Sequence, residues 1–198
     1  NFFSNKNLAQ GIVRGFVLRN NMPERVLLII DGSNFYHRLR ELQLVDLLHF
    51  DYRRFTHMLA GARTITASRY YVGAIREEQG NSKSRELMRN QRILVSNLRK
   101  YGWDACFGHM LKVDALYHEK GVDVLMAVDL LIGAYENSYD TAILVSSDTD
   151  LIPALAKVRA MGKKVEYIGF SHKPSYGLIT HSDIRRLLTK EDMQQFLP

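Results

Sequence analysis

Aspartates occur in this sequence where hydrophobic runs end, at positions from which their carboxylates can meet. Asp31 follows the run VLLII, and Asp148 and Asp150 follow the run TAILV within the stretch SSDTD. Asp123, in the stretch KGVD, opens a long apolar segment. Gathered carboxylates repel one another and raise one another's pKa, so a fold that gathers them usually supplies a counter-charge. Because hard oxygen ligands suit Mg²⁺ and Mn²⁺, these four aspartates form a candidate metal site.

Each of these aspartates also has a purely structural explanation. Asp is a preferred helix N-cap, so Asp31 and Asp148 would serve as caps of the helices that follow them. Asp123 would complement the dipole of the helix that it opens. For any one aspartate the two explanations are balanced, but the occurrence of all of them at strand exits favours a shared site.

Polar neighbours of the aspartates are candidates for supporting roles. Asn34 is predicted either to hydrogen-bond a metal ligand or a substrate phosphate, or to cap the helix, and both options stay open. Ser147 and Thr149 flank Asp148 and are predicted to orient the carboxylates of the SSDTD stretch. Thr149 is also a candidate N-cap for the next helix.

The segment 123–136 is apolar on nearly every side, which predicts a deeply packed helix. Asp129 lies within it, six residues after Asp123, which places it about 120° around the helix and about 9 Å along the axis. The two carboxylates are therefore not expected to bind one ion. A polar group in so apolar a helix needs a partner, so Asp129 is predicted to have a supporting role beside a basic side chain or a helix end.

Hydrophobic patterning predicts the elements that position these residues. Predicted strands cover residues 25–30, 64–75, 141–147 and 163–170, with 103–109 and 111–115 as one strand or the two arms of a hairpin. Predicted helices cover residues 34–42, 52–59, 82–101, 123–136, 153–161 and 190–196, with a weak helix or turn at 176–181. This alternation predicts an α/β fold, a three-layer α/β/α sandwich around a mainly parallel sheet. Ligands of such sheets bind beyond the carboxyl ends of the strands, where Asp31, Asp148 and Asp150 lie.

The length and composition fit one ordinary globular domain. The chain has 198 residues, 46% hydrophobic and 24% charged, enough to bury a sizeable core. We expect an N-terminal extension over residues 1–24, partly helical, and a single domain over residues 25–198. The net charge of +6 favours a polyanionic partner only slightly.

The cysteine count and hydropathy bear on location. Cys106 is the single cysteine, which excludes a disulfide within the chain and fits a reducing cytoplasm. No run reaches the roughly 18 apolar residues of a membrane helix, so no membrane partner is expected. The first residues lack the features of a secretory signal.

Basic residues near the expected site are candidates for contacts with phosphate. The candidates are Arg76, Lys83, Arg85, Arg89, Arg92 and Lys120. A solvated helix face is the alternative for the arginines of the amphipathic helix, and it is favoured for Arg99. Tyr36 and His37 are candidates for base stacking, whereas Tyr70 and Tyr71 are expected in the core.

Three motifs together resemble those of the NYN domain. They are Asp31-Gly32-Ser33-Asn34, Lys120-Gly121-Val122-Asp123 and Ser146-Ser147-Asp148-Thr149-Asp150. Their order, spacing and setting match, and the resemblance runs from about residue 25 to residue 170. NYN domains, including their LabA-like branch, are PIN-like ribonucleases related in fold to the flap endonucleases. One departure is Ser147, where relatives often have Gly.

The resemblance implies a Rossmann-like PIN fold and an acidic pocket that holds Mg²⁺ or Mn²⁺. It also implies hydrolysis of RNA, with single-stranded RNA and endonucleolytic cleavage favoured. By the same resemblance, Asp31, Asp123, Asp148 and Asp150 are the metal-site acids, with Asn34 beside them. Because PIN-like domains often pair, a homodimer is left open.

Other functions fit this sequence less well. A phosphatase of the haloacid-dehalogenase type needs a second Asp two residues after the first, and Ser33 occupies that position. Nucleotide cofactor binding is disfavoured because no GxGxxG or GxxxxGK[ST] loop follows any strand. An RNA-binding or scaffold protein with weak or no catalysis is the main alternative, and a metal-dependent phosphatase is less favoured.

Overall fold

A computed structural model describes residues 23–44, 46–75, 81–113 and 116–198 of the chain. The expected N-terminal extension therefore lies outside the described residues except for residues 23 and 24, and Arg76 lies outside them as well. In the part of the chain that the structure describes, no helix is both long and apolar enough to cross a bilayer.

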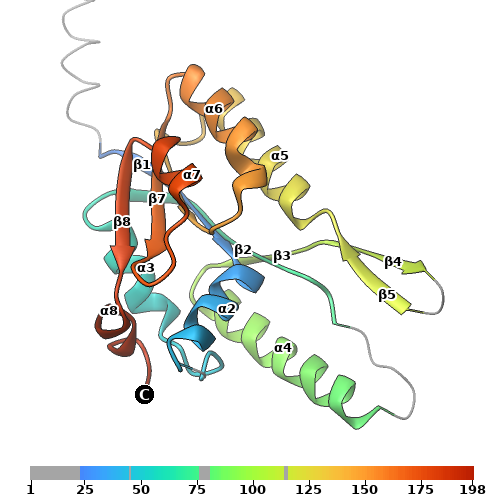
Figure 1. The fold of residues 1–198 in the computed structure, drawn as a ribbon. Helices are drawn as coiled ribbons and strands as arrows, with labels where there is room; N and C mark the ends of the chain where they lie inside the picture. Colours follow the sequence, from blue (N-terminus) through green and yellow to red (C-terminus); the bar gives the residue numbers. More distant parts are fainter. Residues whose placement is uncertain (1–22, 45, 76–80, 114–115) are drawn as a thin grey trace, which may run out of the picture.

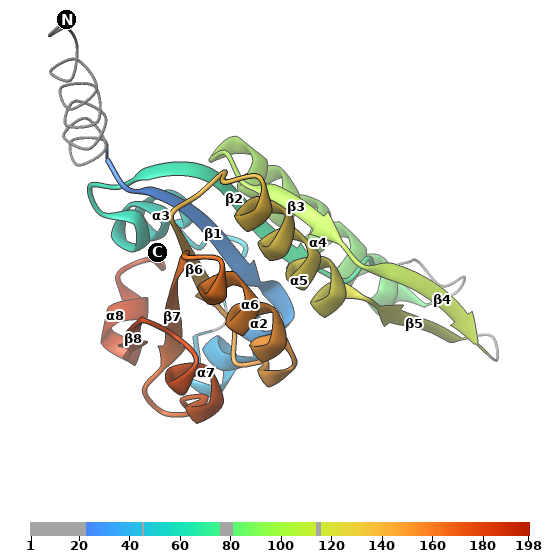
Figure 2. The ribbon, with the colours of Figure 1, turned by 90° about the horizontal axis from the view of Figure 1, so that it is seen from above.

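A six-stranded parallel sheet forms the centre of the molecule (Figures 1 and 2). Its strand order is β3-β2-β1-β6-β7-β8. The strands are β1 (Arg25–Asp31), β2 (Thr64–Val72), β3 (Asp104–Phe107), β6 (Thr141–Val145), β7 (Lys164–Phe170) and β8 (Ile184–Leu188). Every neighbouring pair is parallel, so the expected α/β fold with a parallel sheet is confirmed.

Helices cover both faces of this sheet. One face is covered by α2 (Gly32–Glu41), α3 (Tyr52–Ala60), α4 (Ser82–Lys100) and α8 (Lys190–Gln194). The other face is covered by α5 (Val122–Tyr135), α6 (Ile152–Ala160) and α7 (Tyr176–Thr180). Side chains alternate along β1, so that Leu28 and Ile30 contribute to the first core and Leu27 and Ile29 to the second. Central strands covered on both faces read as continuous apolar runs, as β1 and β6 do.

A separate two-stranded antiparallel sheet projects from the body of the molecule, as Figures 1 and 2 show. It consists of β4 (His109–Val113) and β5 (Leu116–Lys120). Of the two options for residues 103–109 and 111–115, the hairpin between them is therefore wrong, whereas a strand within residues 103–109 is confirmed. The first of these segments contains β3, which extends the main sheet beside β2, and the hairpin is formed farther along the chain.

The outer side of α5 corrects a second expectation. Met126 and Leu130 are fully buried against the sheet, but Val124 is 65% exposed and Tyr135 is 84% exposed. Val128 and Ile132 are also exposed and lie on the same stripe of the helix. The prediction of a deeply packed helix is therefore right for only one side of α5, because a helix laid on a sheet can turn only one stripe towards it.

Gly32 lets α2 begin directly after β1. A Cβ atom at this position would lie 2.3 Å from Cε1 of Tyr70 and 2.7 Å from the carbonyl oxygen of Tyr71. Both neighbours belong to β2 and are buried, so neither can move aside. The first turn of α2 therefore lies against β2 only because residue 32 has no side chain.

We predict that Gly32→Ala lowers the free energy of unfolding by about 1–3 kcal/mol, the usual cost of overpacking a core. Urea denaturation followed by circular dichroism measures this change. Gly177→Ala is the matched control, because its Cβ would meet only side-chain atoms of Ile152 and Thr149, at 3.1 Å. Equal destabilisation by the two substitutions would contradict the proposed role of Gly32.

Candidate metal centre

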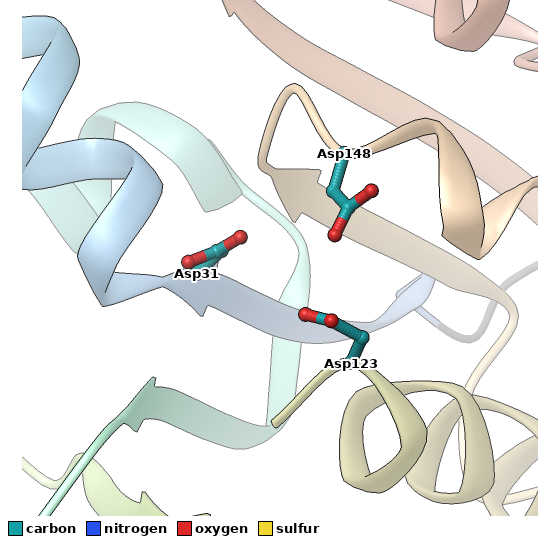
Figure 3. Close-up of side chains that lie close together, drawn as sticks. All are labelled: Asp31, Asp123 and Asp148. Carbon is teal, nitrogen blue, oxygen red and sulfur yellow. The ribbon is translucent and has the colours of Figure 1, made fainter. Parts of the chain in front are cut away.

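Three carboxylates from distant parts of the chain meet at the carboxyl edge of the sheet (Figure 3). Asp31 ends β1, Asp148 follows β6, and Asp123 lies in the first turn of α5. Each offers an oxygen atom, and these oxygens lie within 4.8 Å of one another. Because β1 and β6 are adjacent parallel strands with Ile30 opposite Val145, their carboxyl ends deliver Asp31 and Asp148 to the same place.

Asp31 is buried and fixed by two hydrogen bonds. One carboxylate oxygen accepts from the backbone N–H of Asn34 at 3.0 Å, and the other accepts from Oγ of Ser146 at 3.1 Å. Burial raises the pKa of Asp31, the two hydrogen bonds lower it, and the charge of Asp148 raises it further. The net effect is a raised pKa, so this site makes the ionised form of Asp31 costly unless a cation is near.

Asp148 combines the two roles that the sequence left open. Its Oδ1 accepts from the backbone N–H of Asp150 at 2.9 Å, which caps the short 3-10 helix η1 (Thr149–Leu151). Asp31 likewise caps α2. Because each ionised carboxylate has about four acceptor positions, capping leaves both residues free to bind a cation. The structural and functional explanations are therefore compatible.

Asp123 is more exposed than Asp31. Partial burial raises its pKa, and the charges of Asp148 and Asp31 raise it further. Gly121, two residues before Asp123, adopts a left-handed conformation with φ of 82°. This conformation turns the chain from β5 into α5 without the steric cost of a side chain. Like charges on separate elements thus face one another at short range.

These carboxylates line a pocket of about 330 Å³. Its other lining residues are Ser33, Asn34, His37, Lys120, Gly121 and Val122. A cluster of hard oxygen donors with excess negative charge fits a divalent cation such as Mg²⁺ or Mn²⁺. The donor set therefore fits a divalent metal centre, in which a cation would offset the charge of the three carboxylates.

Asp150 and Thr149 lie beside the cluster rather than within it. Asp150 is exposed and is not among the three carboxylates that share the centre, although its charge contributes to the raised pKa of Asp123. Thr149 is also exposed, and the residue that caps η1 is Asp148. The expectation that Thr149 is the N-cap is therefore wrong.

Ser146, which the sequence interpretation passed over, orients the carboxylates. Its hydroxyl donates to Asp31 and accepts from the backbone N–H of Asp148 at 3.0 Å. Ser147, which was expected in that role, instead contacts Asn34 and Arg38. Ser146 is buried whereas Ser147 is half-buried, and the two hydroxyls have different partners. The signal in the sequence is that Ser146 directly follows the buried strand β6, so its side chain is expected to be buried beside the carboxylates.

Asp129 lies away from the cluster, as expected. It accepts from Oη of Tyr71 at 2.5 Å and pairs with Arg69 at 2.8 Å, both residues of β2. The expected basic partner is therefore confirmed as Arg69. Burial and the contact with Asp129 raise the pKa of Tyr71, which stays a neutral donor. Asp129 ties α5 to β2 and in this way supports the position of Asp123.

Among the expected phosphate contacts, Lys120 lines the pocket. The remaining described candidates, Lys83, Arg85, Arg89 and Arg92, are exposed on α4, and none of them lines the pocket. Tyr36 and His37 are exposed near the pocket on α2. Tyr70 and Tyr71 are buried, which confirms their expected place in the core.

A parallel α/β/α sandwich with carboxylates gathered at the carboxyl edge is the arrangement of a PIN-like domain. The family model of the NYN domain matches residues 25–185, so the chain belongs to the NYN domain family of PIN-like nucleases.

Comparison with solved structures agrees with this fold. The chain is similar to a crystal structure of a protein of unknown function from Vibrio parahaemolyticus, with a TM-score of 0.63 and 23% sequence identity. The similarity covers 85% of this chain and 94% of that chain and concerns the fold alone. Comparison with curated proteins gives no match.

We predict that Asp123→Asn stabilises the metal-free protein at neutral pH but not at acid pH. The pKa of Asp123 is higher in the folded state than in the unfolded state. Protonation of Asp123 therefore favours the folded state, and this contribution to stability is complete below the unfolded-state pKa. That stability is lost as the pH rises through the folded-state pKa. The difference in unfolding free energy between variant and wild type should therefore grow between about pH 3.5 and about pH 7.5. This range begins near the ordinary pKa of an aspartate and extends well above it.

Chemical denaturation in EDTA at a series of pH values measures this difference. Asp104→Asn, at an exposed carboxylate on β3 outside the cluster, is the control and should show no comparable trend. A stability difference for Asp123→Asn that does not change with pH would show that the cluster carries no electrostatic strain.

Proposed function

We propose that this NYN domain protein is a metal-dependent ribonuclease that hydrolyses phosphodiester bonds of single-stranded RNA, cutting endonucleolytically. The proposed cofactor is Mg²⁺ or Mn²⁺, bound by Asp31, Asp123 and Asp148. The observation that carries this proposal is the convergence of these three carboxylates within 4.8 Å at the carboxyl edge of an NYN domain. The single cysteine, Cys106, supports a cytoplasmic place of action.

The protein side chains hold and orient in this proposal, and none forms a covalent bond with the substrate. A bound divalent cation supplies Lewis acidity, which lowers the pKa of a bound water and neutralises charge on the phosphate. Asp31 is held still because its two oxygens accept from Asn34 and Ser146. Asp123 and Asp148 face it from α5 and from the end of β6. Asp150, which is exposed beside the cluster, is proposed as a fourth carboxylate that would help to hold the cation.

Positive charge near the pocket supports a polyanionic substrate. Lys120 lines the same pocket as the three carboxylates, and a lysine there offsets the repulsion between the carboxylates and a phosphate. Lys83, Arg85, Arg89 and Arg92 on α4 are proposed to contact the RNA backbone farther away. Tyr36 and His37, which are exposed on α2, are proposed to stack on bases, since aromatic stacking accepts any base.

We predict that Asp148→Asn abolishes cleavage of a single-stranded oligoribonucleotide in Mn²⁺ while the protein stays folded. Mutation of a residue that only supports a metal ligand typically lowers activity about 10- to 100-fold. Loss of the ligand itself should lower the cleavage rate by more than this. A gel assay of cleavage before EDTA treatment, after it, and after Mn²⁺ is restored measures the effect, and circular dichroism checks the fold.

Asp104→Asn is again the control, and it should cut at the wild-type rate. If the wild-type protein binds the RNA tightly but never cuts it in Mn²⁺ or Mg²⁺, the proposed nuclease activity is contradicted. The protein would then be an RNA-binding protein instead. Release of phosphate from a monoester with no cleavage of RNA would favour the phosphatase alternative.

We predict that Lys120→Ala weakens RNA binding for every sequence and reduces its dependence on salt. Each phosphate contact to single-stranded nucleic acid contributes about 0.7 to the slope of log affinity against log salt. The slope of the variant should therefore be smaller by about 0.7. Fluorescence anisotropy at several salt concentrations measures it.

Lys164→Ala is the matched control for that experiment. Lys164 is exposed at the first residue of β7, at the opposite edge of the sheet from the pocket, so its removal should leave the slope unchanged. Equal slopes for wild type and Lys120→Ala would show that Lys120 makes no contact with phosphate.

A further inference from the structure

Arg38 lies one helical turn after Asn34 on α2 and holds the side chain of Ser147. Its Nε and Nη2 donate to Oγ of Ser147 at 3.2 and 3.0 Å. Its Nη1 donates to both carboxylate oxygens of Glu41 at 3.0 and 2.8 Å. The side chain of Arg38 is only 16% exposed. The guanidinium group is therefore fixed on two sides and does not reach into the pocket.

Glu41 is itself held in place by other groups. His172 contacts it at 3.0 Å and Lys173 at 3.4 Å, both from the segment after β7. Hydrogen bonds from Arg38 first, and then from His172, lower the pKa of Glu41 to about 2. Glu41 is therefore ionised at neutral pH and remains a constant partner for Arg38.

The hydrogen bonds of Ser147 decide the orientation of the Asn34 amide. A guanidinium group only donates, and a hydroxyl has two lone pairs and one hydrogen. Because Arg38 occupies both lone pairs of Ser147 Oγ, the hydroxyl hydrogen is left to donate. It donates to Oδ1 of Asn34 at 2.5 Å. The carbonyl end of the Asn34 amide therefore points at Ser147, and the NH₂ end points the other way.

The NH₂ group of Asn34 is left with donors to offer. Asn34 lines the pocket that holds the three carboxylates. Among the described residues, none accepts a hydrogen bond from its amide nitrogen. An amide nitrogen only donates, so it cannot ligate a cation, but it suits an anionic oxygen. Hard cations bind amides through the carbonyl oxygen, and in Asn34 that oxygen is turned toward Ser147.

We propose that Asn34 binds a phosphate oxygen of the RNA through its amide nitrogen, and that Arg38 is the positioning residue that fixes this orientation through Ser147. The inference rests on the proposed ribonuclease function and adds a division of labour within its site. Asp31, Asp123 and Asp148 bind the cation, whereas Asn34 binds the substrate and makes no bond to the metal.

Arg38 matters because the two orientations of a side-chain amide have almost the same shape. If Arg38 did not occupy the lone pairs of Ser147, the hydroxyl could accept as readily as donate. A reversed Asn34 amide would then direct its oxygen into the pocket, beside the carboxylates, as a fourth oxygen ligand. The two hydrogen bonds from Arg38 to Ser147 therefore decide whether Asn34 contacts the substrate or the metal.

Substitutions of Asn34 test the first half of this proposal. Mn²⁺ affinity is measured by calorimetry, and kcat and KM are measured on a single-stranded oligoribonucleotide. Asn34→Ala should leave Mn²⁺ affinity within about twofold of wild type while KM rises about tenfold, the usual worth of a hydrogen bond to a charged group. Asn34→Asp should raise KM further, because a carboxylate then faces the phosphate. A loss of Mn²⁺ affinity of about tenfold in Asn34→Ala would overturn the proposal.

A double-mutant cycle tests the role of Arg38. Arg38→Lys keeps the charge but offers a point donor in place of the planar fork, so KM should rise severalfold. The same change in an Asn34→Ala background should have no further effect, because Arg38 acts only through Asn34. Additive effects would overturn the positioning role and show direct contact with RNA. Arg53→Lys, at an exposed arginine on α3 that does not line the pocket, is the control for charge and should leave KM unchanged.

Failure of this inference is distinguishable from failure of the proposed function. A wild-type protein that neither binds nor cuts the RNA overturns both. A wild type that cuts the RNA, with Asn34→Ala impaired in Mn²⁺ affinity and not in KM, overturns the inference alone. Thermal unfolding of each variant verifies that the changes in KM do not come from loss of fold.

Discussion

Mutual repulsion among three carboxylates is the constraint that the surrounding structure has to overcome. Their approach is enforced by the pairing of β1 with β6 and by the packing of α5, all of which are driven by burial of apolar side chains. Each fully buried Leu, Ile or Val contributes about 1.5–3 kcal/mol, and β1 and β6 together bury a long run of them. A sheet centre of this kind can hold a cluster that is unfavourable by itself, which leaves the cluster poised for a cation.

Polar side chains around the cluster are divided between its two sides. Ser146 serves the carboxylates, and its neighbour Ser147 serves Asn34. The helix α2 contributes to both sides, since the backbone of Asn34 holds Asp31 while its side chain faces the pocket. In the proposed ribonuclease, these two adjacent serines with different partners would separate the cation side from the phosphate side of a pocket of about 330 Å³.

Sequence patterns identified the parts of this structure that depend on local chemistry. Asp31 and Asp148 follow from the rule that parallel strands deliver their carboxyl ends to one edge, and β1, β6 and β7 follow from their apolar runs. The strand β8 was not predicted, because its sequence IRRLL contains two arginines, as edge strands often do. Likewise β5, with the sequence LYHEK, has no strand-like alternation of apolar residues. The Arg38–Ser147 contact joins residues 109 apart, and no local pattern encodes such a contact.

The wide separation of the three carboxylates along the chain affects when the pocket can exist. Asp31 is synthesised early, Asp123 much later and Asp148 later still, and the parallel pairing of β1 with β6 joins segments more than 100 residues apart. Non-local pairing of this kind forms late in folding, since the closure of a long loop must come first. During translation, then, the emerging chain holds isolated carboxylates and no assembled pocket. The pocket therefore assembles only after the chain through Asp148 has been synthesised and the central sheet has closed.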